Sequence, residues 1–143
     1  MPELDAGEAH ERLAGARVAR LATADVAGRP HLVPMTFAVL DATTIVSAID
    51  HKPKRTVALR RLANIAANPQ VAVLADHYDE DWTRLWWARA DGMARTVAVE
   101  DEPDLRARAL SALRMRYAPY RDHPPAGALV VIDVRRWSGW RAA

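Results

Sequence analysis

The sequence predicts a mostly β protein of one domain, in which an antiparallel sheet of about six to seven strands closes into a β-barrel with three flanking helices. Three observations support this fold class. Six segments are rich in β-branched and alternating apolar residues, as strands are. The first three are joined by connections too short for parallel crossovers. No candidate edge strand is long and charged, and closure into a barrel would remove the edges. The 143 residues suffice for one such core.

The chain begins with a predicted helix over residues 2–16, which Asp5 can cap at its N-terminus. Residues 17–23 and 30–40 then form a predicted hairpin around a turn that contains Asp and Gly. Pro34 lies inside the second strand and lacks a backbone donor, so it marks an edge or a bulge there.

A third strand is predicted over residues 43–49, because five of its residues are β-branched. A helix over about 54–67 follows, and it ends before an Asn-Pro pair. Residues 70–75 form the fourth predicted strand, which leads into an acidic loop. The fifth covers residues 83–99, with a bulge or bend expected at Gly92.

The last third of the chain contains a predicted helix over residues 102–117, with acidic residues in its first turn, where the helix dipole favours them. Residues 118–127 are expected to be irregular because they are rich in proline. The final strand is predicted over residues 128–134, ahead of the basic and aromatic segment RRWSGWR.

The stretch from residue 47 to 62, SAIDHKPKRTVALRRL, concentrates basic residues at the start of a predicted helix. The chain has 18 Arg but only two Lys, and both lysines, Lys52 and Lys54, lie here beside Arg55. Backbone N–H groups at a helix N-terminus, supplemented by such cations, form a site for phosphate or carboxylate. The alternative is a solvated basic helix start without a ligand.

Other chemistry is sparse in the sequence. The chain has no Cys, its five histidines lack metal-binding spacing, and no P-loop, nucleophile elbow or dinucleotide fingerprint occurs. The acidic loop DHYDED lacks the ligand spacing of a calcium site, so a solvated turn is the default. An enzyme built from this chain would therefore depend on a cofactor for its chemistry.

The net charge of +2 does not indicate a nucleic-acid partner. No apolar run approaches the ~20 residues of a membrane span, and the polar N-terminus is unlike a signal peptide. We therefore expect a cytoplasmic protein.

Five tryptophans lie in the C-terminal half of the chain. On a strand, Trp86 and Trp87 point to opposite faces, so one can enter the barrel while the other needs a second apolar surface. A subunit interface or a ring-shaped ligand would supply that surface, and partial exposure is the alternative.

The segments ARLATADVAGRPHLVPMTF and VSAIDHKPKRTVALRRLANIAANPQVAVLADHYDEDWTRLWWARADGMA closely resemble the pyridoxamine 5'-phosphate oxidase-like superfamily. Members of that superfamily have a split, FMN-binding-like β-barrel. The runs DHKPKR and DHYDEDWxRLWWxRxDG are most similar to the actinobacterial group of probable coenzyme F420-dependent oxidoreductases. The resemblance implies a homodimer whose barrels enclose two cofactor sites at their interface.

The resemblance also implies a set of site residues. Phosphate would be held by the strand-end Ser and the basic loop, and the ring system would lie along the second strand, with the end of the third strand nearby. Arg60 and Arg61 of the helix would attract the poly-γ-glutamate tail of F420. Trp87 or Trp82 would line the acceptor side, together with residues 118–127 as a mobile lid. The expected cofactor-binding residues are Pro34, Met35, Thr36, Ser47, Ala48, Ile49, Lys52, Lys54, Arg55, Arg61 and Trp87.

The function implied is hydride transfer from reduced F420 to a small, planar organic acceptor, without a catalytic residue of the protein as nucleophile. Solvent, His31, Tyr117 or Tyr120 would supply a proton. Three alternatives remain open from the sequence: an FMN-dependent oxidase or reductase of the same fold, a non-catalytic carrier of flavin, deazaflavin or haem, and an interaction protein whose basic helix face points outward and binds a partner such as nucleic acid.

Overall fold

The computed structural model describes residues 3–49 and 55–143, without the side chains of residues 55–59. Its seven strands form one sheet in the order β2-β1-β5-β6-β7-β4-β3, and every neighbouring pair is antiparallel. The strands are β1 (Ala19–Ala24), β2 (Pro30–Met35), β3 (Ala38–Asp41), β4 (Thr44–Ala48), β5 (Gln70–His77), β6 (Trp86–Val97) and β7 (Leu129–Arg141). The predicted fold class is confirmed.

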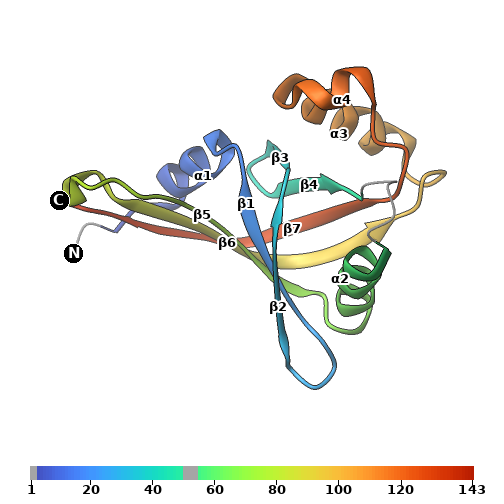
Figure 1. Cartoon of the computed structure of the whole chain (residues 1–143), viewed down its shortest axis with the longest axis horizontal. Coiled ribbons are helices and arrows are strands. Elements are labelled where there is room, and N and C mark those ends of the chain that lie inside the picture. The colour runs from blue at the N-terminus through green and yellow to red at the C-terminus, as the bar shows by residue number, and fades with distance from the viewer. Residues whose placement is uncertain (1–2, 50–54) are drawn as a thin grey trace.

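The two outermost strands of the sheet, β2 and β3, are joined by only Thr36 and Phe37. Strands at opposite edges can be connected this closely only if the sheet curls until the edges approach each other. The result is a barrel that stays open along one seam, with β2 crossing in front of the curled sheet (Figure 1). Phe37 closes the seam from inside, where its side chain is fully buried.

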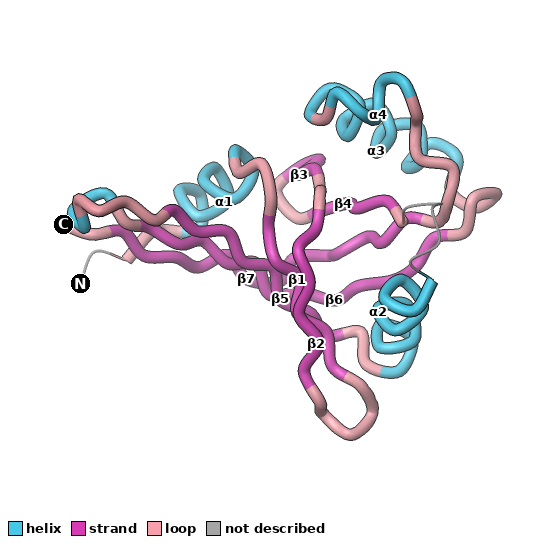
Figure 2. Tube along the Cα trace, in the orientation of Figure 1, coloured by secondary structure: helices cyan, strands magenta, loops and turns pink. Residues whose placement is uncertain are grey.

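The two longest strands, β6 and β7, pair along their whole length, with a register shift between Asp91 and Gly92. The bulge predicted at Gly92 is therefore confirmed. A Cβ on this glycine would lie 2.3 Å from the carbonyl oxygen of Asp133 on β7. Beyond the crossing with β1 and β2, the strands β5, β6 and β7 continue together beside helix α1 (Figure 2).

Four α-helices cover the sheet: α1 (Ala6–Gly15), α2 (Arg55–Ala67), α3 (Pro103–Arg116) and α4 (Ala118–Asp122). The carboxylate of Asp5 accepts a hydrogen bond from the Glu8 N–H, and the Glu8 carboxylate accepts one from the Asp5 N–H, which confirms the predicted cap. Helix α1 packs on β6 and β7, α2 on β6 and β1, and α3 on β3. None of the helices in the described ranges is long and apolar enough to cross a bilayer.

Three predicted segments differ from the structure. The strand expected over 30–40 is two strands, because the chain leaves β2 after Met35 to close the seam. The region 118–127 is not wholly irregular: Pro119 lies at the start of α4, where a missing N–H costs nothing, so a fourth helix forms. The final strand extends seven residues beyond Val134, because residues 136–141 pair with the first half of β6.

The ends of two other strands also differ. The fourth strand continues through His77, where an acidic loop was expected, because Asp76 and His77 pair with Trp87 and Trp86. The fifth strand begins at Trp86, after a short 3₁₀ helix, η1 (Trp82–Arg84).

Candidate functional site

The barrel seam brings together three hydroxyl groups from distant parts of the chain. Ser47, at the end of β4, donates a hydrogen bond to the Thr36 carbonyl oxygen over 2.7 Å. The Thr36 hydroxyl lies 2.9 Å from the hydroxyl of Tyr120 on α4. Ser47 is only 2% exposed, so its hydroxyl lies in the interior of the protein. We call Thr36, Ser47 and Tyr120 the seam cluster.

A second tyrosine fixes the backbone next to the seam cluster. The Tyr117 hydroxyl accepts a hydrogen bond from the Phe37 N–H at 3.1 Å. It can donate its own hydrogen to the carbonyl oxygen of Arg17 at 2.9 Å or to that of Phe37 at 3.1 Å. Tyr117 and Tyr120 meet edge to face, with ring centroids 5.7 Å apart. The end of α3 and the start of α4 therefore hold the link between β2 and β3 in place.

Arg61 on α2 is a cation close to Tyr120 of this cluster. Burial of its guanidinium lowers the pKa of Arg61, and the nearby Tyr120 phenol acts in the opposite direction. The Nε atom of Arg61 is buried and has no hydrogen-bond partner among the described residues. A buried donor without an acceptor is costly, so an anionic or strongly accepting group is what this position suits. Arg61 therefore fits a phosphate- or carboxylate-bearing cofactor.

The other predicted basic residues give no structural test. Lys52 and Lys54 lie outside the described residues, and so does the side chain of Arg55, although Arg55 is the first residue of α2. The predicted phosphate site at the start of this helix stays a prediction.

The remaining predicted ring contacts lie on both sides of the sheet. Met35 is buried in the core, whereas Pro34 is exposed on the outer face, because neighbouring strand residues point to opposite faces. Ala48 is 7% exposed and pairs with Leu129. Ile49 continues the pairing, and its N–H donates to the Ala128 carbonyl oxygen. Met35 and Pro34 therefore cannot present their side chains to one side of a ring.

Trp87 lies far from the end of β4 along the sheet. It is ten residues from Val97 on β6, which is about 33 Å of strand at about 3.3 Å per residue. Val97 pairs with Leu129, which in turn pairs with Ala48. Trp87 thus lies near the start of β6, whereas the end of β4 lies level with the end of β6.

Trp87 instead lines a groove of about 610 Å³ on the outer face of β2, β1, β5 and β6, which we call the outer groove. Its walls are mainly apolar and aromatic. The lining residues include Ala22, Leu32, Ala72, Leu74, Tyr78, Trp86, Trp87 and Trp140. The sequence analysis did not predict that Leu32 and Leu74 line a groove, although both are exposed residues that alternate with less exposed neighbours in predicted strands. Such an outward apolar set is the signal for a covered sheet face.

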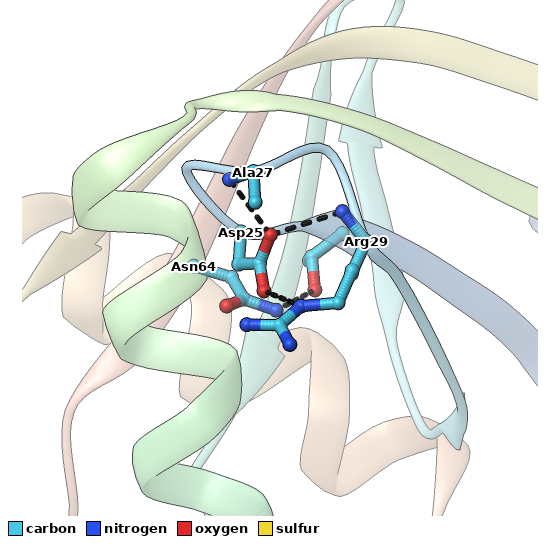
Figure 3. Close-up of polar contacts among 5 residues, drawn as sticks. Asp25, Ala27, Arg29 and Asn64 are labelled. Carbon is cyan, nitrogen blue, oxygen red and sulfur yellow. Dashed lines mark hydrogen bonds and ion pairs between the residues drawn. The ribbon is translucent and has the colours of Figure 1, made fainter.

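A second, polar cavity of about 340 Å³ lies between the β1–β2 turn and α2. We call it the turn cavity, and Asp25, Arg29, Pro30, His31, Arg60 and Asn64 line it. The Asp25 carboxylate organises the turn, since it accepts hydrogen bonds from the N–H groups of Ala27 and Arg29 and from the Arg29 side chain (Figure 3). The hydrogen bonds from Arg29, first from its backbone and then from its side chain, lower the pKa of Asp25.

The curled seven-stranded sheet, its seam between β2 and β3 and the flanking helices define a split-barrel protein. Residues 6–141 match the sequence profile of pyridoxamine 5'-phosphate oxidase, and the chain belongs to that family. A search among curated proteins found no match.

Solved structures share the fold. An FAD-binding protein from Mesorhizobium loti is 23% identical, with a TM-score of 0.74, over 99% of this chain and 97% of that one. A conserved hypothetical protein from Mycobacterium tuberculosis is 27% identical, with a TM-score of 0.70, over 96% and 84%. The haem storage protein HutZ from Vibrio cholerae is 19% identical, with a TM-score of 0.69, over 94% and 92%. Structures at these identities support the barrel and its connectivity.

Proposed function

We propose that this protein is an F420-dependent oxidoreductase that transfers a hydride from reduced F420 to a small, planar organic acceptor. The observation that carries the proposal is the buried Nε of Arg61, which has no hydrogen-bond partner among the described residues. It lies close enough to the seam cluster for the Tyr120 phenol to affect the pKa of Arg61. Membership of the pyridoxamine 5'-phosphate oxidase family supports a cofactor of the flavin type. The resemblance of the DHKPKR and WWxRxDG segments to F420-dependent proteins favours the deazaflavin.

Bound F420 would supply the hydride, and the chain would supply binding and orientation. Arg61 would hold an anionic part of the cofactor through charge-assisted hydrogen bonds. The hydrogen bonds of Ser47 and Tyr120 to Thr36 fix the position of the seam backbone, so the cofactor would meet a preorganised wall. The Tyr120 hydroxyl is the one group of the seam cluster on a helix rather than on the sheet or its seam, and it would pass a proton to the reduced acceptor.

FMN would fit the same arrangement, since it also combines a tricyclic ring with a phosphate. A non-catalytic carrier is the second candidate function, and one observation favours it. The three hydroxyls of the seam cluster take part in two hydrogen bonds within the protein, and these bonds hold the seam in place.

Cofactor identity is tested by titrating purified protein with F420, FMN and haem while following fluorescence or absorbance. We expect F420 to bind most tightly, and Arg61→Gln to weaken it by about 1.5–3 kcal/mol, the range for a hydrogen bond to a charged group. Arg136→Gln, an exposed arginine on β7, is the matched control and should bind like the parent protein. Tighter binding of FMN or haem, or equal binding by the Arg61 variant, would contradict the proposal.

Turnover separates an enzyme from a carrier. Protein-bound reduced F420 should be oxidised by at least one quinone or tetrapyrrole acceptor faster than free reduced F420 is. If no acceptor in a broad panel gains from the protein, the carrier function replaces the oxidoreductase.

We also propose that the protein acts as a homodimer joined through the outer groove. The groove is apolar, and its charged groups are balanced, with Arg20 paired to Asp76 and Arg89 paired to Asp91. Two copies of such a face can meet about a twofold axis without net charge repulsion. Trp87 would then serve the cofactor site from the partner, because within its own chain it lies far from the end of β4.

A further inference from the structure

The turn cavity contains more positive than negative groups, and its function is not explained by the seam. Arg29, Arg60 and His31 face one carboxylate, that of Asp25. The Arg29 Nε lies 2.8 Å from the Asp25 carboxylate, so these two charges largely cancel. Among the described lining residues no second carboxylate balances Arg60, which therefore adds about one positive charge to the cavity. His31 adds ring nitrogens that can donate a hydrogen bond.

The cavity is built rigidly. Asn64, one helical turn after Arg60, is 5% exposed and donates a hydrogen bond to the Thr23 hydroxyl over 3.0 Å. That contact ties α2 to β1, and residues at i and i+4 share a helix face, so Arg60 lies over the same side. On the opposite wall, the Asp25 carboxylate holds the turn that carries Arg29 (Figure 3). The cavity therefore exists before any ligand binds.

His31 gives an independent indication of a missing partner. Its Nδ1 atom is buried and has no hydrogen-bond partner among the described residues. An acceptor oxygen in the cavity would satisfy this nitrogen when it carries the proton. Arg60 and His31 thus both suit an acceptor group with one negative charge, which is the chemistry of a carboxylate. A phosphate would bring more negative charge than the cavity balances, beside the Asp25 carboxylate.

We infer that the turn cavity is a carboxylate-binding site, separate from the seam and served by Arg60, His31 and Arg29. Six residues of β2 and its link, about 20 Å of strand, separate Pro30 from Thr36. One extended ligand could therefore occupy both places along β2. The identity of the ligand rests on the proposed function. If that function holds, the carboxylates are those of the γ-glutamyl tail of F420; otherwise they belong to a free carboxylic acid.

The test compares F420 that carries several γ-linked glutamates with F420 that carries none, in the parent protein, Arg60→Gln and Arg29→Gln. We expect each variant to lose about tenfold in affinity for the tailed form, as for one hydrogen bond to a charged group, and to bind the tail-less form like the parent. Arg136→Gln is the control for charge. Unchanged thermal unfolding of each variant shows that its fold is intact.

A second arm uses tri-γ-glutamate, citrate and inorganic phosphate, with amide NMR signals of Ala27, Gly28 and His31 as the readout. The carboxylates should shift these signals in the parent protein and not in Arg60→Gln, and phosphate should bind more weakly. If neither form of F420 binds but the carboxylates do, the proposed function fails while the carboxylate site stands. A different result would overturn the inference while the proposed function stands. In that case F420 binds, the variants bind the tailed and the tail-less form as tightly as the parent does, and no carboxylate shifts the signals. Tighter binding of phosphate would also overturn it.

Discussion

Tyr117 shows how one side chain can secure the seam at the scale of a single residue. It is 9% exposed, and its hydroxyl contacts backbone groups of Arg17 and Phe37, which are 100 and 80 residues away in the chain. Arg116, its neighbour, donates to the carbonyl oxygens of Ala14 and Ala16, one of them at 2.7 Å. The end of α3 is thereby bound to the end of α1 and to the link beside the seam cluster.

Tyr117→Phe should lower the free energy of unfolding by about 1–3 kcal/mol, because it leaves the buried Phe37 N–H without an acceptor. Urea denaturation measures the change. Tyr78→Phe is the matched control, since Tyr78 is 63% exposed and should unfold within about 0.5 kcal/mol of the parent. A similar loss in both variants would show that the Tyr117 hydroxyl has no special structural role.

At the scale of elements, the β6–β7 ribbon depends on close backbone approach at its bulge. Gly92 leaves no room for a side chain, since its nearest neighbours are backbone atoms of Asp133 and Val134. Backbone atoms of a central strand pair cannot move aside as a flexible side chain can. The bulge lets the ribbon bend from the barrel into its extension beside α1 (Figure 2).

Gly92→Ala should therefore destabilise the protein by about 1–3 kcal/mol, the typical range for overpacking. Gly15→Ala provides a contrast, because no atom lies within 4 Å of a Cβ at this helix position. That variant should be neutral or more stable by up to about 1 kcal/mol. Thermal and urea unfolding of the two variants would decide the matter, and a neutral Gly92→Ala would show that the strands separate at little cost.

At the scale of the whole molecule, the outer groove leaves apolar side chains exposed on a face that no helix of the described chain covers. Leu32 is 67% exposed and Leu74 is 37% exposed. Large exposed apolar patches mark interaction surfaces. The proposed dimer would bury them and bring Trp87 to a second copy.

Sedimentation should therefore give a species of about twice the 15.8 kDa chain mass at micromolar concentration. Leu32→Arg should shift the equilibrium toward the monomer, because it would bury a charge without a partner in the interface. Met115→Arg on α3, where Met115 is 78% exposed, should leave the dimer intact. A parent protein that sediments as a monomer would count against the homodimer.

Local signals in the sequence were sufficient for much of the fold. The Asp5 cap, the first hairpin and the Gly92 bulge depend on neighbouring residues, and all three were predicted. The break between β2 and β3 was not, since the strand-forming residues around Phe37 run on without a turn signal. Only closure of the sheet requires the break. The end of β7 was missed for a related reason: Arg135 and Arg136 break the alternation, while pairing with β6 extends the strand.

In the candidate site too, features that depend on neighbouring residues could be predicted, and features that depend on contacts between distant elements could not. Basic residues after the third strand could be recognised in the sequence, and the 3.6-residue helical period separates Arg60 from Arg61 around α2. The turn cavity could not be predicted, because its walls meet only when α2 packs against β1. The hydrogen bond between Tyr120 and Thr36 likewise depends on where α4 lies against the seam.

The position of β7 has a consequence for synthesis of the protein. This strand is the last of the sheet to be synthesised, yet it lies inside the sheet, between β6 and β4. Until it emerges, β4 and β6 each present an unpaired edge, and the nascent chain can hold only two separate fragments, β2-β1-β5-β6 and β4-β3. Open edges and uncovered apolar surface favour association between unfinished chains. Chaperone binding during translation should therefore be concentrated in the interval before residues 129–141 become available.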